Sequence, residues 1–187
     1  TRKKWRVRIA DMLPMVGECA FWSIPLVAMG LLLSRPIALP IPAAASVLVE
    51  GAAAGDASLP NSLAGQIVTG IGAGIYEEFV FRLVLIVLLM ILFQNLLGIQ
   101  HTASVIASVL ISAALFSAYH HVDILPIETG LRAADPFTWP KFIFRAAAGV
   151  YFAILFAFRG FGITAGTHAF YNIIVALMKT DLFASGS

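Results

Sequence analysis

Long apolar segments constrain this sequence more than any other feature. A bilayer's hydrocarbon core is spanned by about 20 mostly apolar helical residues, and the 187-residue chain contains several such runs. Charged residues make up 12% of the chain, against roughly 25% in soluble domains. The mean hydropathy is +0.92. We therefore predict an all-α fold, a polytopic bundle of transmembrane helices that forms a single domain over residues 1–187.

Five segments, give or take one, are predicted to cross the membrane. The second begins with several glycines, Gly65, Gly70, Gly72 and Gly74, which predicts a kinked or partly re-entrant first half. A tight turn at 159–162 is expected between the last two segments. The predicted spans are Met12–Leu33, Leu63–Phe93, Thr102–His120, Lys141–Phe158 and Ile163–Met178.

Positive charge is concentrated at the N-terminus, where residues 1–8 hold five of the twelve Lys and Arg residues. Such clusters favour the cytoplasmic side, which predicts a cytoplasmic N-terminus with Arg159 on the same side and with Arg35 and Arg132 outside. A net charge of +2 gives no reason to expect a nucleic-acid partner. The single Cys19 excludes a disulfide framework. The alanine-rich composition favours a bacterial inner membrane.

Three charged residues interrupt the second apolar segment, at Glu77, Glu78 and Arg82. A charged residue at the centre of a membrane helix costs about 2.5–3.5 kcal/mol on insertion scales, so these groups need partners or water. Glu78 and Arg82 are i,i+4 neighbours on one helix face and predict an ion pair. Glu77 lies about 100° away around the helix and does not share that pairing, which makes it a candidate general base.

Two further segments carry imidazoles near their ends. His120 lies on the same helix face as Phe116, whereas His121 points elsewhere. His168 and Asn172 are i,i+4 neighbours and therefore also share a face. The alternating direction of the predicted spans would bring these groups together in the outer half of the membrane.

Each feature alone has an ordinary structural explanation. The Glu78–Arg82 pair could be an intramembrane salt bridge, and a lone His120 often lies at a helix end in the interface. His168 and Asn172 could hydrogen-bond between helices. Together, however, the three segments supply a base, two imidazoles and an amide donor. This combination favours a catalytic site over a purely structural one.

The polar residues also form three short motifs, each on its own hydrophobic segment. In chain order they are Glu77-Glu78-Phe-Val-Phe-Arg82, Phe116-Ser-Ala-Tyr-His120 and His168-Ala-Phe-Tyr-Asn172. This set resembles the motifs of the type II CAAX prenyl endopeptidases and their bacterial relatives, often called the CPBP or Abi intramembrane protease family. The resemblance covers roughly residues 63–178, the motif-bearing core of the chain.

The resemblance implies an α-helical intramembrane endopeptidase that cuts near the C-terminal end of a membrane-associated, in some members lipidated, substrate. By motif position, Glu77 and His120 would activate the attacking water. His168 and Asn172 would bind the oxyanion of the tetrahedral intermediate. The supporting residues of the site would be Glu78, Arg82 and Phe116.

The sequence leaves two alternatives open: a zinc cofactor in place of none, and a catalytically silent protein in place of an enzyme. We expect no cofactor, although Glu77, His120 and His168 form a ligand set common in zinc enzymes. The motif His-Glu-x-x-His is absent, and an Asn at i+4 from His168 suits a hydrogen-bond donor better than a ligand. The expected partners are a membrane-associated protein or peptide substrate and the lipid bilayer.

The second function class is a catalytically silent scaffold, immunity or regulatory protein that binds its partner through the same cavity. A proton path or transporter would also use intramembrane carboxylates. The sequence shows no inverted repeat and no paired broken helices to support a transporter.

Overall fold

Every regular element in the described part of the chain is helical. The computed structural model describes residues 9–33, 62–121 and 137–184. Arg2–Arg8, Arg35 and Arg132, on which the predicted orientation depends, lie outside these residues, as does most of each predicted long connection. The elements are α1 (Ile9–Leu33), α3 (Leu63–Glu78), the π-helix η1 (Phe79–Leu85), α4 (Ile86–Met90), the π-helix η2 (Ile91–Leu96), α5 (His101–Tyr119) and α6 (Trp139–Ala184).

Four helical segments within these ranges are long enough and apolar enough to cross a membrane, whereas five were predicted. The first three agree with the predicted spans. The predicted fourth and fifth spans both lie within one element, α6. The four segments are Met12–Leu32, Leu63–Leu96, His101–Tyr119 and Trp139–Met178.

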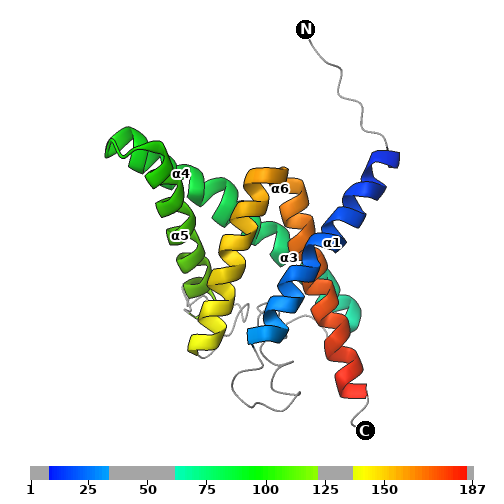
Figure 1. Ribbon diagram of the computed structural model, residues 1–187. Coiled ribbons are helices and arrows are strands. Elements are labelled where there is room, and N and C mark those ends of the chain that lie inside the picture. The colour runs from blue at the N-terminus through cyan, green and yellow to red at the C-terminus, as the bar shows by residue number, and fades with distance from the viewer. Residues whose placement is uncertain (1–8, 34–61, 122–136, 185–187) are drawn as a thin grey trace.

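The continuity of α6 is broken at Gly160, where the backbone has φ 76° and ψ 178°. A positive φ is readily adopted by glycine because it lacks a Cβ. The chain reverses there, and Figure 1 shows α6 as two legs that meet at a sharp bend. Thr164 stabilises the turn by donating a hydrogen bond from Oγ1 to the Gly160 carbonyl at 3.0 Å. The turn predicted at 159–162 is therefore present.

The two legs of α6 form the centre of the bundle and pack against α1, α3 and α5. The start of α1 and the bend of α6 lie at the same end of the molecule (Figure 1). The side of the membrane on which this end lies stays a prediction, since residues 1–8 lie outside the described part of the chain. Arg159 of α6 also binds α1, because its Nη2 donates a hydrogen bond to the Glu18 Oε2 at 2.6 Å.

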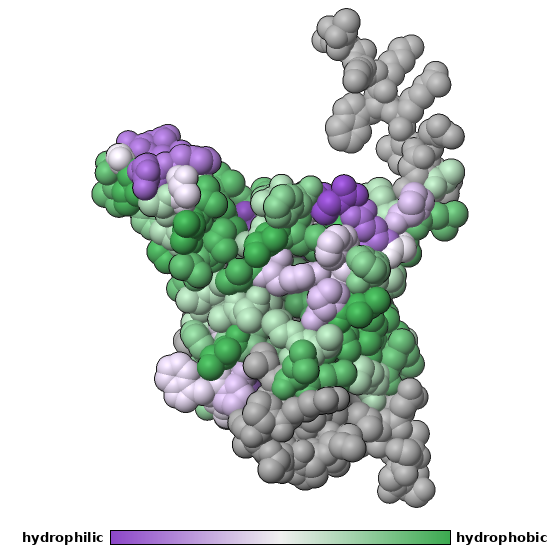
Figure 2. Space-filling model, in the orientation of Figure 1, coloured by the Kyte–Doolittle hydropathy of each residue, from purple (hydrophilic) through white to green (hydrophobic). Residues whose placement is uncertain are grey.

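The surface and the interior have the distribution of polarity expected of an integral membrane protein. Large apolar side chains project outward, with Phe158 80% exposed, Leu13 74% and Val68 67%. Figure 2 shows hydrophobic residues over the sides of the visible face and hydrophilic residues gathered mainly at its upper edge. Buried charges lie inside the bundle, where such groups in membrane helices usually face one another.

Two glycines of α3, Gly70 and Gly74, serve close helix packing, and the helix is regular where a kink or re-entrant half was predicted. Leu63–Glu78 is a regular α-helix, and the π-helical turns begin only after it. A Cβ at Gly70 would lie 3.0 Å from the Asn172 Cβ, and one at Gly74 would lie 3.0 Å from the Ala169 backbone nitrogen. The pair forms a Gly-x-x-x-Gly pattern, which lets membrane helices approach closely. The sequence spacing of these glycines fits close packing of helices as well as it fits the predicted kink.

Two alanine substitutions within α3 should therefore have opposite effects on stability. Gly74→Ala forces α3 away from the α6 backbone and is expected to destabilise the fold by about 1–3 kcal/mol. Gly72→Ala has nothing within 4 Å of the new Cβ, and it should stabilise the helix by about 0.5–1 kcal/mol. Unfolding in detergent measures both. Equal effects of the two variants would contradict the close approach at Gly74.

Candidate active site

The two adjacent glutamates lie at the junction between α3 and the π-helix η1. Glu77 is 5% exposed and Glu78 is fully buried. π-Helical turns are rare, and they occur frequently at functional sites. The apolar run favours a helix because a bilayer leaves backbone groups few other partners, and Ser62 caps its start by accepting a hydrogen bond from the Gly65 N–H at 3.2 Å. No sequence signal indicated the π-helical turn.

Glu78 and Arg82 form the ion pair predicted from their spacing. The Arg82 Nε lies 3.0 Å from the Glu78 Oε2, and both side chains are buried almost completely. Breaking such a pair from one side leaves an uncompensated charge in a medium of low dielectric constant. The pair therefore compensates two buried charges and fixes the two side chains relative to one another.

Three further groups hold the Arg82 guanidinium. Its Nη2 donates to the Gly149 carbonyl at 3.2 Å. Its central carbon lies 4.5 Å from the centroid of the Phe116 ring and 5.3 Å from that of Phe152. Aromatic faces attract cations, most strongly where water is excluded. Gly149 must be small, since a Cβ there would lie 2.9 Å from the Ala113 Cα.

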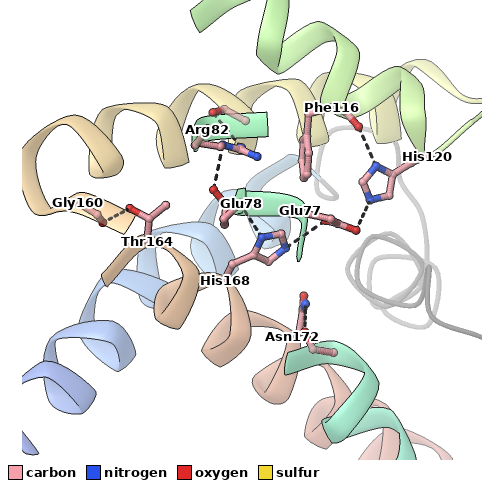
Figure 3. A network of polar contacts seen from close by, with 11 residues as sticks. Glu77, Glu78, Arg82, Phe116, His120, Gly160, Thr164, His168 and Asn172 are labelled. Carbon is pink, nitrogen blue, oxygen red and sulfur yellow. Dashed lines mark hydrogen bonds and ion pairs between the residues drawn. The ribbon is translucent and has the colours of Figure 1, made fainter. Parts of the chain in front are cut away.

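His168 connects this pair to Glu77 (Figure 3). Its Nδ1 lies 2.8 Å from the Glu78 Oε1, and its Nε2 lies 3.8 Å from the Glu77 Oε2. The ring stacks on Phe152 with a centroid separation of 4.5 Å and an interplanar angle of 20°. An ionised carboxylate can only accept a hydrogen bond. The Nδ1 of His168 therefore carries the hydrogen and donates a hydrogen bond to Glu78. The second ring nitrogen is thereby directed at Glu77.

His120 approaches the same carboxylate from α5. Its Nδ1 lies 2.8 Å from the Phe116 carbonyl oxygen, which can only accept, so Nδ1 is the protonated nitrogen. The Nε2 then carries the lone pair of the neutral ring and lies 3.7 Å from the Glu77 Oε1. The neighbouring His121 contacts Arg145 instead, at 3.4 Å between Nε2 and Nη1, in agreement with the prediction that it points elsewhere.

Glu77 thus has one imidazole Nε2 facing each of its two carboxylate oxygens. Distances of 3.7 and 3.8 Å are too long for direct hydrogen bonds and suit polar groups bridged by a water molecule. All three side chains are at most 7% exposed. In Figure 3 the carboxylate lies between the two rings. The arrangement can bind and polarise a small reactant out of contact with bulk water.

Asn172 lies one helical turn beyond His168 on the second leg of α6. Its Nδ2 donates one hydrogen bond to the Gly70 carbonyl at 2.8 Å. The Oδ1 is buried and makes no hydrogen bond with the described residues. The bond to Gly70 fixes the orientation of the amide and leaves one N–H of Nδ2 for a second acceptor.

One comparison with known proteins identifies the family. The family model for type II CAAX prenyl endopeptidases, described as Rce1-like, matches residues 59–174. The chain belongs to this family. The match confirms the resemblance found in the sequence motifs. No curated protein and no solved structure matches the chain.

The three polar motifs identified in the sequence meet inside the bundle. The structure brings together Glu77, Glu78, Arg82, Phe116, His120 and His168 through the contacts described above. Asn172 is placed beside them by the Gly70 carbonyl. Buried Glu and His side chains in this cluster are consistent with a protease active site of the family.

Sequence reasoning missed two residues of the cluster. Phe152 stacks on His168 and lies beside Arg82, but one aromatic among many in an apolar helix gives no signal. Gly149 was assigned no role in the site, although it accepts from Arg82 and packs on Ala113. A small residue inside a membrane helix was the available signal.

The same cluster contains the residues of the zinc alternative. The described part of the chain has no group of three His, Cys, Asp or Glu side chains arranged to hold a metal ion. The Nδ1 hydrogen bonds of both histidines would nevertheless also suit ligands whose other nitrogen binds a metal. The donor types, one carboxylate and two imidazoles, are ones that zinc binds in enzymes.

Proposed function

We propose that the chain is an intramembrane endopeptidase that hydrolyses a peptide bond near the C-terminal end of a membrane-associated substrate. Membership of a family of CAAX proteases supports a protease. The observation that carries the proposal is the buried Glu77 carboxylate with an imidazole Nε2 on each side. Amide hydrolysis needs an activated water, stabilisation of the oxyanion and a proton for the leaving amine. The cluster has groups for each task.

Glu77 and His120 are the proposed water-activating pair. A water bridging the Glu77 Oε1 and the His120 Nε2 would span the 3.7 Å between them and could donate to both acceptors. Loss of its proton to either group generates the nucleophile, and the same group returns a proton to the leaving amine. General acid–base catalysis of this kind contributes about 10²–10⁴-fold to rate.

His168 and Asn172 are the proposed oxyanion donors. The Glu78 carboxylate holds the His168 ring at Nδ1, and the ring donates from Nε2 when that nitrogen carries a proton. Asn172 donates from the N–H that does not bind Gly70. Removing one well-placed oxyanion donor typically costs about 2.7–4 kcal/mol of barrier. Glu78 therefore acts on the donor side of the site, whereas Glu77 acts on the water.

Comparison of the membrane proteomes of cells carrying the wild type and Glu77→Gln tests the proposal. The variant should accumulate substrate proteins with uncut C-terminal ends. A catalytically silent scaffold of the same family predicts a different result, because its cellular function would survive both Glu77→Ala and His120→Ala. Retention of function in both variants would exclude proteolysis as that function.

Metal dependence has a separate test. We propose metal-independent catalysis, so purified protein should keep its peptidase activity after chelation and should contain no stoichiometric zinc by elemental analysis. If zinc is the cofactor, Glu77, His120 and His168 would hold it, and it would polarise the attacking water. Complete loss of activity on chelation with recovery by zinc alone would overturn the metal-independent mechanism.

A further inference from the structure

A serine on α5 bonds to the backbone of the π-helix that carries Arg82. Ser112 is 2% exposed, and its Oγ donates to the Phe81 carbonyl oxygen at 2.8 Å. The bond joins α5 to η1 (Phe79–Leu85), the segment that follows the two glutamates. None of the three family motifs contains Ser112.

A side-chain donor to the Phe81 carbonyl suits this position for a physical reason. The wider turns of a π-helix depart from the i→i−4 pattern of the α-helix, and water is not available in the bilayer core to bind the affected carbonyls. Serine and threonine side chains on neighbouring helices commonly fill this role. Ser112 therefore supports the π-helical turn at the point where Phe81 faces α5.

The same bond fixes the peptide plane that leads into Arg82. The peptide bond is planar, so the Phe81 carbonyl and the Arg82 N–H and Cα lie in one plane. Holding that carbonyl restricts the orientation of the plane and hence the direction in which the Arg82 side chain leaves the backbone. Arg82 binds Glu78 at 3.0 Å, and Glu78 in turn binds the His168 Nδ1 at 2.8 Å.

We infer that Ser112 is a positioning residue of the active site, acting through the Phe81 carbonyl and Arg82 on Glu78 and His168. The inference rests on the proposed function for its effect on activity. The structural part of the inference is that the Ser112 hydroxyl fixes the orientation of the Phe81 carbonyl. This part does not depend on which reaction the protein performs.

The chain offers a matched control one turn away on the same helix. Ser108 is also fully buried, but its hydroxyl makes no hydrogen bond with the described residues. Ser108→Ala and Ser112→Ala therefore remove the same atom from the same helix in similar burial. Only the second removes a donor from the π-helix.

Selective isotope labelling makes the carbonyl visible without an activity assay. Protein labelled with carbonyl-¹³C phenylalanine and ¹⁵N arginine gives paired amide signals only where Phe precedes Arg, at Phe81–Arg82, Phe144–Arg145 and Phe158–Arg159. Ser112→Ala should move the Phe81 carbonyl resonance and leave the other two in place, whereas Ser108→Ala should move none. An unchanged Phe81 resonance in Ser112→Ala would overturn the inference.

Kinetics then test the effect on catalysis. In Ser112→Ala, kcat should fall about tenfold, equivalent to about 1.4 kcal/mol of barrier, while KM changes less than about twofold because substrate contacts are retained. Ser112→Thr, which restores a hydroxyl, should recover most of kcat, and Ser108→Ala should match the wild type. Equal loss in both alanine variants, or a loss that threonine does not recover, would show a packing effect and contradict positioning.

The two parts of the experiment separate the inference from the proposed function. An inactive wild type would refute the proposed protease, and the Phe81 resonance would still decide whether Ser112 organises the π-helix. An active wild type with an unaffected Ser112→Ala variant would leave the protease in place and refute the positioning role.

Discussion

Glu77→Gln is expected to lower kcat for peptide hydrolysis about 10³-fold while leaving the fold intact. Glutamine keeps the size of the side chain and one oxygen acceptor, but it cannot take a proton from water between Glu77 and His120. General-base catalysis contributes about 10²–10⁴-fold, so the loss should fall in that range. The measurement is turnover of a C-terminal peptide substrate by the purified protein, together with its unfolding transition in detergent.

Glu18→Gln is the matched control for that experiment. Glu18 binds Arg159 and receives a hydrogen bond from the Trp22 Nε1 at 3.2 Å, in contacts separate from those of the active-site cluster. The same change of carboxylate to amide at Glu18 should leave kcat close to the wild-type value. Similar losses at both positions would indicate that any glutamate substitution disturbs the bundle, and Glu77 would lose its assignment as base.

Arg82→Met is expected to produce the largest loss of stability. The substitution leaves the Glu78 carboxylate buried without its cation and removes the bond to Gly149. Breaking a buried ion pair from one side costs about 3–5 kcal/mol. Denaturant unfolding in detergent micelles would measure the change in free energy. The matched control is Arg159→Met, whose side chain is 49% exposed and whose loss should be much smaller.

The double variant Glu78→Met/Arg82→Met separates the cost of an uncompensated buried charge from the cost of altered packing. Removing both partners avoids the uncompensated charge, and replacement of buried ion pairs by apolar residues is often close to neutral. The double variant should therefore be more stable than Arg82→Met alone. It should remain inactive, because His168 has lost its Nδ1 partner. A double variant less stable than the single variant would mean that burial of charge does not govern this site.

The agreement between sequence and structure is closest where a rule of local geometry applies. The i,i+4 spacing of Glu78 and Arg82 predicted their ion pair, and the 100° offset separated Glu77 from it. Apolar runs of spanning length predicted helices, since a bilayer leaves the backbone few alternatives. The turn between the predicted last two spans was also located correctly, at Gly160.

Buried charges inside an apolar chain mark the position of the candidate active site. The sequence by itself determined that these groups must find partners, because an isolated charge in hydrocarbon is too costly. It also determined which of them share a helix face. It did not determine that His168 binds Glu78 through Nδ1, because that contact joins residues 90 positions apart and depends on how α3 and α6 pack.

Only the tertiary structure decided the roles of the small residues. Gly70, Gly74 and Gly149 set the distances between α3, α5 and α6, yet a glycine in one sequence fits a kink as well as a close contact. The tertiary structure also decided which ring nitrogen of His120 and of His168 faces Glu77, and it decided the bond from Ser112 to the π-helix. Local spacing fixes directions within one helix, whereas the distances between catalytic groups depend on how closely the backbones approach.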